Sequence, residues 1–175
     1  MALKFKGKTW VFGDNLDVDF EIIPFRKYDA GLIKDSDLGN WCMTNVDPDF
    51  PKKVKKGDIM VVGTNMGCGH DHGGANSAIK QCGISCVIAE SFDRNFFRNS
   101  IAIGLPIIEY KGIKQNVKEG TNWRLIFTPV RSKTSPPESP WSSLLSLTFS
   151  RRFSKSAAWT PTPIKWSQRE RLESK

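Results

Sequence analysis

Hydrophobic and polar positions along the chain predict an α/β arrangement that opens with a strand. The stretch KFKGKTWVF carries apolar residues near a period of two, which is typical of a β-strand, and the following GDN predicts a turn. Residues 14–30 mix acids with apolar residues and reach Pro24, so we expect a loop with short extended pieces there rather than a helix. Residues 58–62, DIMVV, form a short apolar run between Gly57 and Gly63, which predicts a buried strand.

Alternating helices and strands are predicted after this strand. Residues 63–74, GTNMGCGHDHGG, predict a glycine-rich loop, and ANSAIKQC predicts a helix that ends at Gly83. ISCVIAE predicts a second buried strand, SFDRNFFRNSIAIG a second helix with Ser91 as N-cap and Gly104 past its end, and LPIIEY a third strand. This order predicts parallel neighbouring strands joined by right-handed crossovers.

The glycine-rich loop lies where sheets of this kind bind ligands. Ligands of parallel sheets sit at the carboxyl ends of the strands, and the loop follows the end of strand 58–62. Glycines let the backbone approach a ligand closely, and bare N–H groups here and at the start of the next helix favour an anion, so we expect a phosphate or carboxylate. The alternative is a tight turn whose glycines serve packing alone.

The loop does not match the common nucleotide motifs. No Gly-Lys-Ser/Thr sequence closes it, as a Walker motif requires, and Gly67-Cys68-Gly69 is followed by His72 where a dinucleotide fingerprint has its third glycine. The sequence therefore disfavours a nucleotide cofactor.

Several separated stretches carry a resemblance to a known family. GDNLDVDFEIIP, CMTNVDPDFPKKVKKGDIMVVGTNMGCG and SCVIAESFDRNFFRNSIAIGLPIIE occur in the order found in the small subunit of 3-isopropylmalate dehydratase, a member of the aconitase superfamily. The chain resembles this family from about Gly7 to about Gly120. The resemblance implies an α/β fold, the swivelling three-layer β/β/α domain of the aconitase small-subunit type, with a parallel βαβαβ core.

The resemblance also implies a function and a partner. The implied reaction is the dehydration and rehydration of a hydroxy-dicarboxylate in leucine biosynthesis, carried out with a dehydratase large subunit. That partner would hold a [4Fe–4S] cluster whose open iron acts as a Lewis acid, so no cofactor is expected in this chain. The small subunit would contribute loop residues that hold the substrate and handle the proton.

The loop departs from the family pattern after Gly-Cys-Gly. The superfamily usually reads Ser-Ser-Arg-Glu-His there, whereas this chain has His70, Asp71, His72 and two glycines. The three side chains are our candidate catalytic residues, because histidine is a base near neutral pH, Asp71 can orient one, and protonated His72 can pair with a carboxylate. Arginine's bidentate fork is missing. A non-catalytic or vestigial domain that binds a small carboxylate is therefore the alternative.

Two further groups of residues are candidates for substrate binding. The first lies in the glycine-rich loop and the second follows Pro24, where the family places a mobile loop that senses the side group of the substrate. The candidates are Asn65, Gly67, Cys68, Gly69, Arg26 and Tyr28. Solvated charge and a packed ring are the alternative interpretation of the last two.

Metal-ligand residue types occur in the loop, but the sequence does not predict a metal site. Cys68, His70, Asp71 and His72 are possible ligands without a distant partner to complete a closed site. For the other candidates we expect structural roles: buried thiols at a helix end and in a strand, and carboxylates that cap turns. These residues are Cys82, Cys86, Asp14, Asp17 and Asp19.

The positive charge belongs to the C-terminal part of the chain. Residues 1–122 contain 16 Lys and Arg against 15 Asp and Glu, whereas residues 123–175 contain 10 against 3, so most of the net +8 lies in the second segment. That segment holds 11 Ser and 6 of the 10 Pro but none of the 14 Gly, which removes the usual turn residues. We expect an aconitase-like domain over 1–122 and an atypical tail over 123–175.

The tail has two possible origins. A reading-frame shift near Asn122 would explain the abrupt change of composition, and residues 123–175 should then be poorly ordered. The alternative is a basic arm for nucleic acid, but no nucleic-acid-binding motif surrounds it, so we expect no such partner.

No stretch reaches the roughly 18 to 20 apolar residues of a membrane span, and the four cysteines form no CxxC pair, so we expect a cytoplasmic protein without a membrane partner.

Overall fold

The computed structural model describes residues 3–70, 73–129 and 145–151. Within these ranges the strands are β1 (Leu3–Val11), β2 (Ile59–Val62), β3 (Cys86–Ala89), β4 (Ile107–Glu109), β5 (Asn122–Pro129) and β6 (Leu145–Arg151). The α-helices are α1 (Phe25–Asp29), α2 (Phe50–Lys53), α3 (Gly74–Cys82), α4 (Arg94–Ala102) and α5 (Ile113–Asn116). A π-helix, η1 (Val18–Ile22), and a 3-10 helix, η2 (Asp35–Trp41), complete the described elements.

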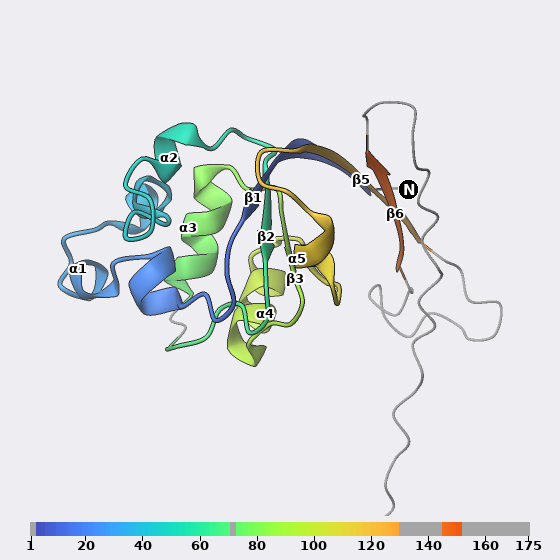
Figure 1. The fold of residues 1–175 in the computed structure, drawn as a ribbon. Coiled ribbons are helices and arrows are strands. Elements are labelled where there is room, and N and C mark those ends of the chain that lie inside the picture. Colours follow the sequence, from blue (N-terminus) through green and yellow to red (C-terminus); the bar gives the residue numbers. More distant parts are fainter. Residues whose placement is uncertain (1–2, 71–72, 130–144, 152–175) are drawn as a thin grey trace, which may run out of the picture.

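The strands form one mixed sheet in the order β4-β3-β2-β1-β5-β6. The first four strands are parallel, as the alternation of strands and helices predicts, and β5 and β6 are antiparallel additions. The end of β1 pairs with β2, with Thr9 opposite Ile59, while its first half pairs with β5, with Lys6 opposite Arg124. Figure 1 shows this first half leading away from α3 together with β5 and β6.

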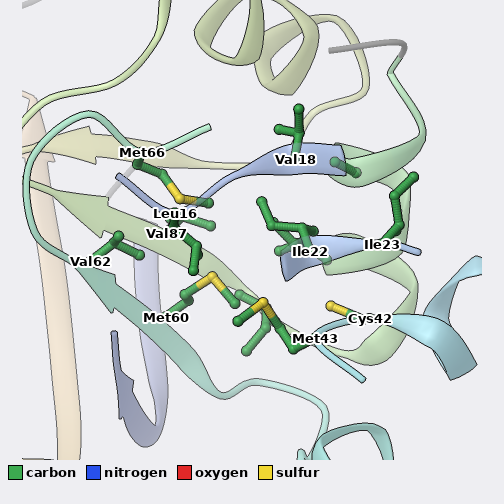
Figure 2. Close-up of a cluster of buried hydrophobic side chains, with 14 of the residues drawn as sticks. Leu16, Val18, Ile22, Ile23, Cys42, Met43, Met60, Val62, Met66 and Val87 are labelled. Carbon is green, nitrogen blue, oxygen red and sulfur yellow. The ribbon is translucent and has the colours of Figure 1, made fainter. Parts of the chain in front are cut away.

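Both faces of the parallel strands are buried. In β2, Met60 and Val62 belong to a large apolar cluster on the face that carries α3, whereas Ile59 and Val61 belong to a smaller cluster on the opposite face. Figure 2 shows Met60 and Val62 beside apolar side chains from the segment after β1. Burying each such side chain contributes about 1.5–3 kcal/mol. This two-sided burial explains why the strand reads as a continuous apolar run rather than an alternating one.

The helix after the glycine-rich loop forms as the sequence predicts. Helix α3 begins after Gly73, whose φ of +79° is left-handed, and ends at Gly83 with φ of +112°. For α4 the predicted N-cap, Ser91, is wrong. Asp93 caps this helix, because its carboxylate accepts hydrogen bonds from the first amides of the helix, including that of Asn95 at 2.7 Å. Ser91 instead accepts a hydrogen bond from the loop after β2.

The prediction of a non-helical segment over residues 14–30 is partly wrong, since η1 and α1 lie within it. The carboxylate of Asp17 accepts hydrogen bonds from the amides of Asp19 and Phe20, and Glu21 accepts one from the amide of Asp17. This reciprocal capping stabilises a turn that apolar periodicity does not reveal. Pro24 breaks the segment as expected but occupies the N-cap of α1, a position that requires no backbone donor.

Predictions about the C-terminal tail fall mainly on residues 130–144 and 152–175, which lie outside the described residues. Within the described part, β5 begins at Asn122 and pairs with β1 from Lys8 to Leu3. No helix among the described residues is both long and apolar enough to cross a membrane.

Candidate functional site at the carboxyl ends of the strands

The glycine-rich loop is attached to the segments that follow both neighbouring strands. On the β1 side, the amide of Gly63 donates to the carbonyl of Gly13 at 3.0 Å, and the amide of Asn15 donates to the carbonyl of Thr64 at 2.8 Å. On the β3 side, the amide of Met66 donates to the carbonyl of Ser91 at 3.0 Å. The loop therefore lies at the carboxyl ends of three parallel strands, as predicted.

Several loop amides are already used inside the protein, so the expectation of a row of bare amides is wrong for them. The amide of Asn65 donates to the Ser91 hydroxyl at 2.8 Å and that of Gly67 to the Leu16 carbonyl at 2.9 Å. The amide of His70 donates to the Asp19 carboxylate at 2.9 Å. The sequence does not show these bonds, because every acceptor is distant along the chain.

One loop amide remains as a candidate anion donor. Cys68 pairs with Asp17 in a parallel bridge, in which the amide of Val18 donates to the Cys68 carbonyl at 2.9 Å. The amide of Gly69 donates no hydrogen bond to another described residue. The first turn of α3 follows the loop, and no described side chain caps it. These donors and the positive end of the helix dipole are the groups that can receive a carboxylate.

The glycines of the loop have different roles. Gly67 has φ of +84°, and a Cβ there would lie 2.3 Å from the ring of Phe96, so packing alone requires glycine at this position. Gly69 has φ of +104°, and its Cβ would lie 2.9 Å from the carboxylate of Asp17. The packing interpretation is thus confirmed for Gly67, whereas Gly69 is exposed.

Of the candidate catalytic residues, the structure describes His70. Its side chain is exposed, and its backbone is held by Asp19. Asp71 and His72 lie outside the described residues, so joint action of the three side chains stays a prediction.

The thiol of Cys68 is a hydrogen-bond donor in this site rather than a nucleophile. It donates to the carbonyl of Asn15 at 3.3 Å. Burial raises the pKa of Cys68, and the nearby negative charges of Asp17, Glu21 and Asp93 raise it further. The protonated thiol therefore persists at neutral pH.

An asparagine pair that the sequence analysis missed spans the two strand ends. Asn15 and Asn65 both have positive φ values, 57° and 56°. The Nδ2 atom of Asn65 donates to the Oδ1 atom of Asn15 at 2.9 Å. Asparagine tolerates the left-handed region better than most residues, so an Asn after Gly-Asp was the available signal for Asn15.

Tyr28 lies beside the end of the loop. A Cβ on Gly74, the first residue of α3, would lie 3.2 Å from the Cε1 atom of Tyr28. The Tyr28 hydroxyl donates to the Asp35 carboxylate at 2.7 Å, and this hydrogen bond, followed by burial and the Asp35 charge, raises the pKa of Tyr28. Arg26 is exposed on the same short helix. The structure thus brings Tyr28 to the site and leaves Arg26 in solvent.

The three aspartates after β1 perform structural roles, as the turn-capping interpretation predicts. Asp14 accepts a hydrogen bond from the amide of Thr64 at 2.8 Å and forms an ion pair with Lys114 at 3.2 Å. Asp17 caps η1, and Asp19 holds the loop. Among the described residues, no group of three or more His, Cys, Asp or Glu side chains is arranged to hold a metal ion.

Known proteins share this sequence and fold. A family model described as the aconitase C-terminal domain matches residues 27–112. The isopropylmalate/citramalate isomerase small subunit of Methanocaldococcus jannaschii is 53% identical over 115 residues, which are 66% of this chain and 67% of that protein. The 3-isopropylmalate dehydratase small subunit of Syntrophus aciditrophicus is 50% identical over 118 residues, 67% of this chain and 70% of that protein.

The chain belongs to the family of 3-isopropylmalate dehydratase small subunits. The crystal structure of the 3-isopropylmalate dehydratase from Methanocaldococcus jannaschii superposes with a TM-score of 0.63 at 41% identity, covering 70% of each chain. This likeness confirms the α/β fold of the aconitase small-subunit type. The family assignment also confirms the enzyme class, a hydro-lyase subunit.

Proposed function

We propose that this small-subunit chain works in the cytoplasm with a dehydratase large subunit and isomerises a hydroxy-dicarboxylate by dehydration and rehydration in leucine biosynthesis. The observation that carries the proposal is the attachment of the loop after β2 to the segments after β1 and β3, at the carboxyl ends of the strands. A loop held from both sides is a preorganised surface for a diacid. The proposed partners are the large subunit and this substrate, not nucleic acid or a membrane.

The cluster is assigned to the large subunit. In the described residues the four thiols do not gather at one point, because Cys68 lies in the loop, Cys86 in β3, and Cys42 and Cys82 near the end of α3. This donor set does not fit a cluster held by thiolates of this chain alone. When bound to the partner, the [4Fe–4S] group supplies Lewis-acid chemistry to the substrate hydroxyl.

The residues of this chain then bind the diacid and handle the proton. The amide of Gly69 and the first amides of α3 donate to a substrate carboxylate, and the exposed imidazole of His70 is the group that transfers the proton. Asp19 positions His70 through its backbone amide at 2.9 Å. Tyr28 borders the far side of the loop next to Gly74, where it contacts the side group of the substrate.

The sequence His70, Asp71, His72 favours weaker carboxylate binding than the family's Ser-Ser-Arg. A single imidazolium donates fewer hydrogen bonds than a guanidinium and lacks its fixed fork. This substitution also supports the second candidate function, a non-catalytic or vestigial domain that binds a small carboxylate.

For the C-terminal part we propose the division into 1–122 and 123–175, with a frame shift near Asn122. The nucleotide sequence tests it, because the neighbouring frame must encode an acidic, glycine-bearing strand.

Reconstitution with a large subunit tests the proposed function. The chain is co-purified with the large subunit from Methanocaldococcus jannaschii, and dehydration of 2- and 3-isopropylmalate is followed. We expect association and turnover; absence of both would overturn the enzyme proposal, whereas association without turnover supports the vestigial domain. Replacing His70, Asp71 and His72 by Ser, Ser and Arg should then raise turnover. A matched control, Lys4→Ser at the exposed start of β1, should leave turnover unchanged.

A further inference from the structure

Two cysteines from distant parts of the sequence meet at the end of α3. Cys42 follows η2, and Cys82 is the last residue of α3. Gln81 fixes these segments to each other, because its Oε1 atom accepts a hydrogen bond from the amide of Gly39 at 3.2 Å and its Nε2 atom donates to the Asp35 carbonyl at 2.8 Å. The two backbones are packed closely at this point: a Cβ on Gly39 would lie 2.9 Å from the amide nitrogen of Cys82.

The thiols of Cys42 and Cys82 are neighbours that affect each other's pKa. Cys42 is fully buried in the large apolar cluster, and Cys82 packs against the same cluster but is partly exposed. The Cys82 thiol also contacts the carbonyl of Ile79 at 3.1 Å. Of the two cysteines, Cys82 is therefore the one that is partly exposed, whereas Cys42 is enclosed.

The surroundings give the two sulfurs unequal reactivity. The neighbouring Cys42 thiol lowers the pKa of Cys82; the backbone N–H groups of Ile84 and of Cys82 itself add to the effect, and burial opposes it. Burial raises the pKa of Cys42. A partly exposed cysteine with a lowered pKa and a second thiol beside it is the arrangement of a reactive cysteine and its resolving cysteine.

The other two cysteines lack this arrangement. Burial raises the pKa of both Cys86 and Cys68, and neither hydrogen-bonds to another thiol in the described part of the chain. They serve as internal controls for the reactivity of the pair.

We propose that Cys42 and Cys82 form an oxidation site that closes reversibly to a disulfide when the protein meets a hydroperoxide. The Cys82 thiolate attacks the terminal oxygen of the hydroperoxide, the O–O bond breaks, and a sulfenic acid forms while the remaining oxygen leaves as water or an alcohol. The Cys42 sulfur then attacks the Cys82 sulfur, the S–O bond breaks, and the oxygen leaves as water. Two thiols and one hydroperoxide thus give one disulfide, and a dithiol reductant reverses the change.

The disulfide would join the end of η2 to the end of α3. The glycine-rich loop lies between these two cysteines in the sequence, so it would belong to the covalently closed segment. Cross-linking restricts the unfolded chain, so the oxidised protein should resist unfolding more than the reduced protein. Helix α3 starts at the loop, and η2 holds Tyr28 through Asp35, so the linked segments are those that border the proposed diacid site.

Peptide mapping of the full chain, purified without a partner, tests the proposal. After a small excess of hydrogen peroxide, two of the four free thiols should disappear, and a non-reducing tryptic digest should contain a cross-link between the peptides bearing Cys42 and Cys82. Because Cys86 lies in the same tryptic peptide as Cys82, the map is made on a Cys86→Ala chain and confirmed by fragmentation. The oxidised chain should melt roughly 5 °C or more above the reduced chain, and dithiothreitol should remove the shift.

Variants separate this pairing from unspecific oxidation. Cys82→Ser should abolish the cross-link and the shift in melting temperature, whereas Cys68→Ser should retain both. Because Cys42→Ser changes a fully buried residue and can impair folding, the pH dependence of Cys82 alkylation by iodoacetamide provides a second measurement on the wild-type chain. The proposal would be overturned by a cross-link that uses Cys68. It would also be overturned if the thiols of Cys42 and Cys82 stayed free under peroxide while the chain remained folded.

Discussion

The carboxylate of Asp19 accepts a hydrogen bond from the backbone amide of His70 at 2.9 Å. This contact joins the segment after β1 to the glycine-rich loop after β2. The amide of Asp19 in turn donates to the carboxylate of Asp17 at 2.7 Å, so the first segment is itself fixed. Two aspartates for which the sequence predicts turn capping therefore also set the position of the candidate catalytic histidine.

Removal of the Asp19 carboxylate should loosen the loop. Asp19→Ala leaves the His70 amide without its acceptor, and a hydrogen bond to a charged group contributes about 1.5–3 kcal/mol. Because Asp19 is only half-buried, we expect a loss of about 1–2 kcal/mol in the free energy of unfolding, measured by urea titration. Hydrogen exchange at His70 should speed up. Asp19→Asn keeps an acceptor and should lose less; equal losses in the two variants would contradict this account.

Much of the fold follows from local patterns. The strands β2, β3 and β4, the helix α3 and its glycine stop were all predictable, because burial on two faces and glycine termini leave clear signals. The helix η1 was not, since Asp17 and Glu21 build it through capping rather than through apolar periodicity.

The candidate site was predictable in place but not in detail. The order of strands and helices locates the loop at the carboxyl ends. The bonds that use up its amides come from Leu16, Asp19 and Ser91, which are remote in sequence and are paired only by the fold. The Asn15–Asn65 contact and the Cys42–Cys82 contact were invisible for the same reason.

Gly67 should tolerate no side chain. In Gly67→Ala the new Cβ would lie 2.3 Å from the Phe96 ring, and the residue would keep a left-handed φ of +84°. Overpacking costs about 1–3 kcal/mol and the left-handed conformation about 1–2 kcal/mol, so we expect a loss of about 3 kcal/mol in the free energy of unfolding.

Gly73 provides the matched control for this substitution. It also has a left-handed φ, +79°, but its Cβ would meet nothing within 4 Å. Gly73→Ala should therefore lose about 1 kcal/mol, the conformational part alone. Urea titration gives the loss in the free energy of unfolding for both variants, and the difference between the two losses is the steric cost of the Phe96 contact. Equal losses would show that this contact has no effect.

Acid should weaken the contact between Asp14 and the loop. The hydrogen bond from the Thr64 amide, then the one from Lys114, hold the pKa of Asp14 below its ordinary 3.8. A carboxyl with a lower pKa in the folded state stabilises the fold above pH 3.8, and this contribution is lost as the pH falls from 3.8 through the folded pKa. The difference in urea midpoint between wild type and Asp14→Asn should be constant near neutral pH and shrink in this acid window.

Salt provides the control for the Asp14 prediction. The ion pair with Lys114 is exposed, so salt should screen it while leaving the backbone hydrogen bond in place. When the comparison is repeated in a Lys114→Gln background, the difference in urea midpoint caused by Asp14→Asn should therefore no longer depend on salt. The part of this difference that comes from the backbone hydrogen bond should remain. A difference between wild type and Asp14→Asn that grows as the pH falls below 3.8 would have the wrong sign and would reject the assignment.

At the opposite end of the sheet, buried Asp58 should be the most sensitive of these positions. Its carboxylate accepts hydrogen bonds from the indole nitrogen of Trp10 at 2.9 Å and from the amides of Lys8 and Lys55, both at 3.0 Å. Asp58→Ala would leave these donors unsatisfied, at about 1–3 kcal/mol for each buried group, so we expect a total loss of about 3–5 kcal/mol in the free energy of unfolding. Asp58→Asn keeps one acceptor oxygen and should lose about 2 kcal/mol. Trp10→Phe removes a single donor, so a loss in Asp58→Ala no larger than in Trp10→Phe would show that the two backbone bonds contribute nothing.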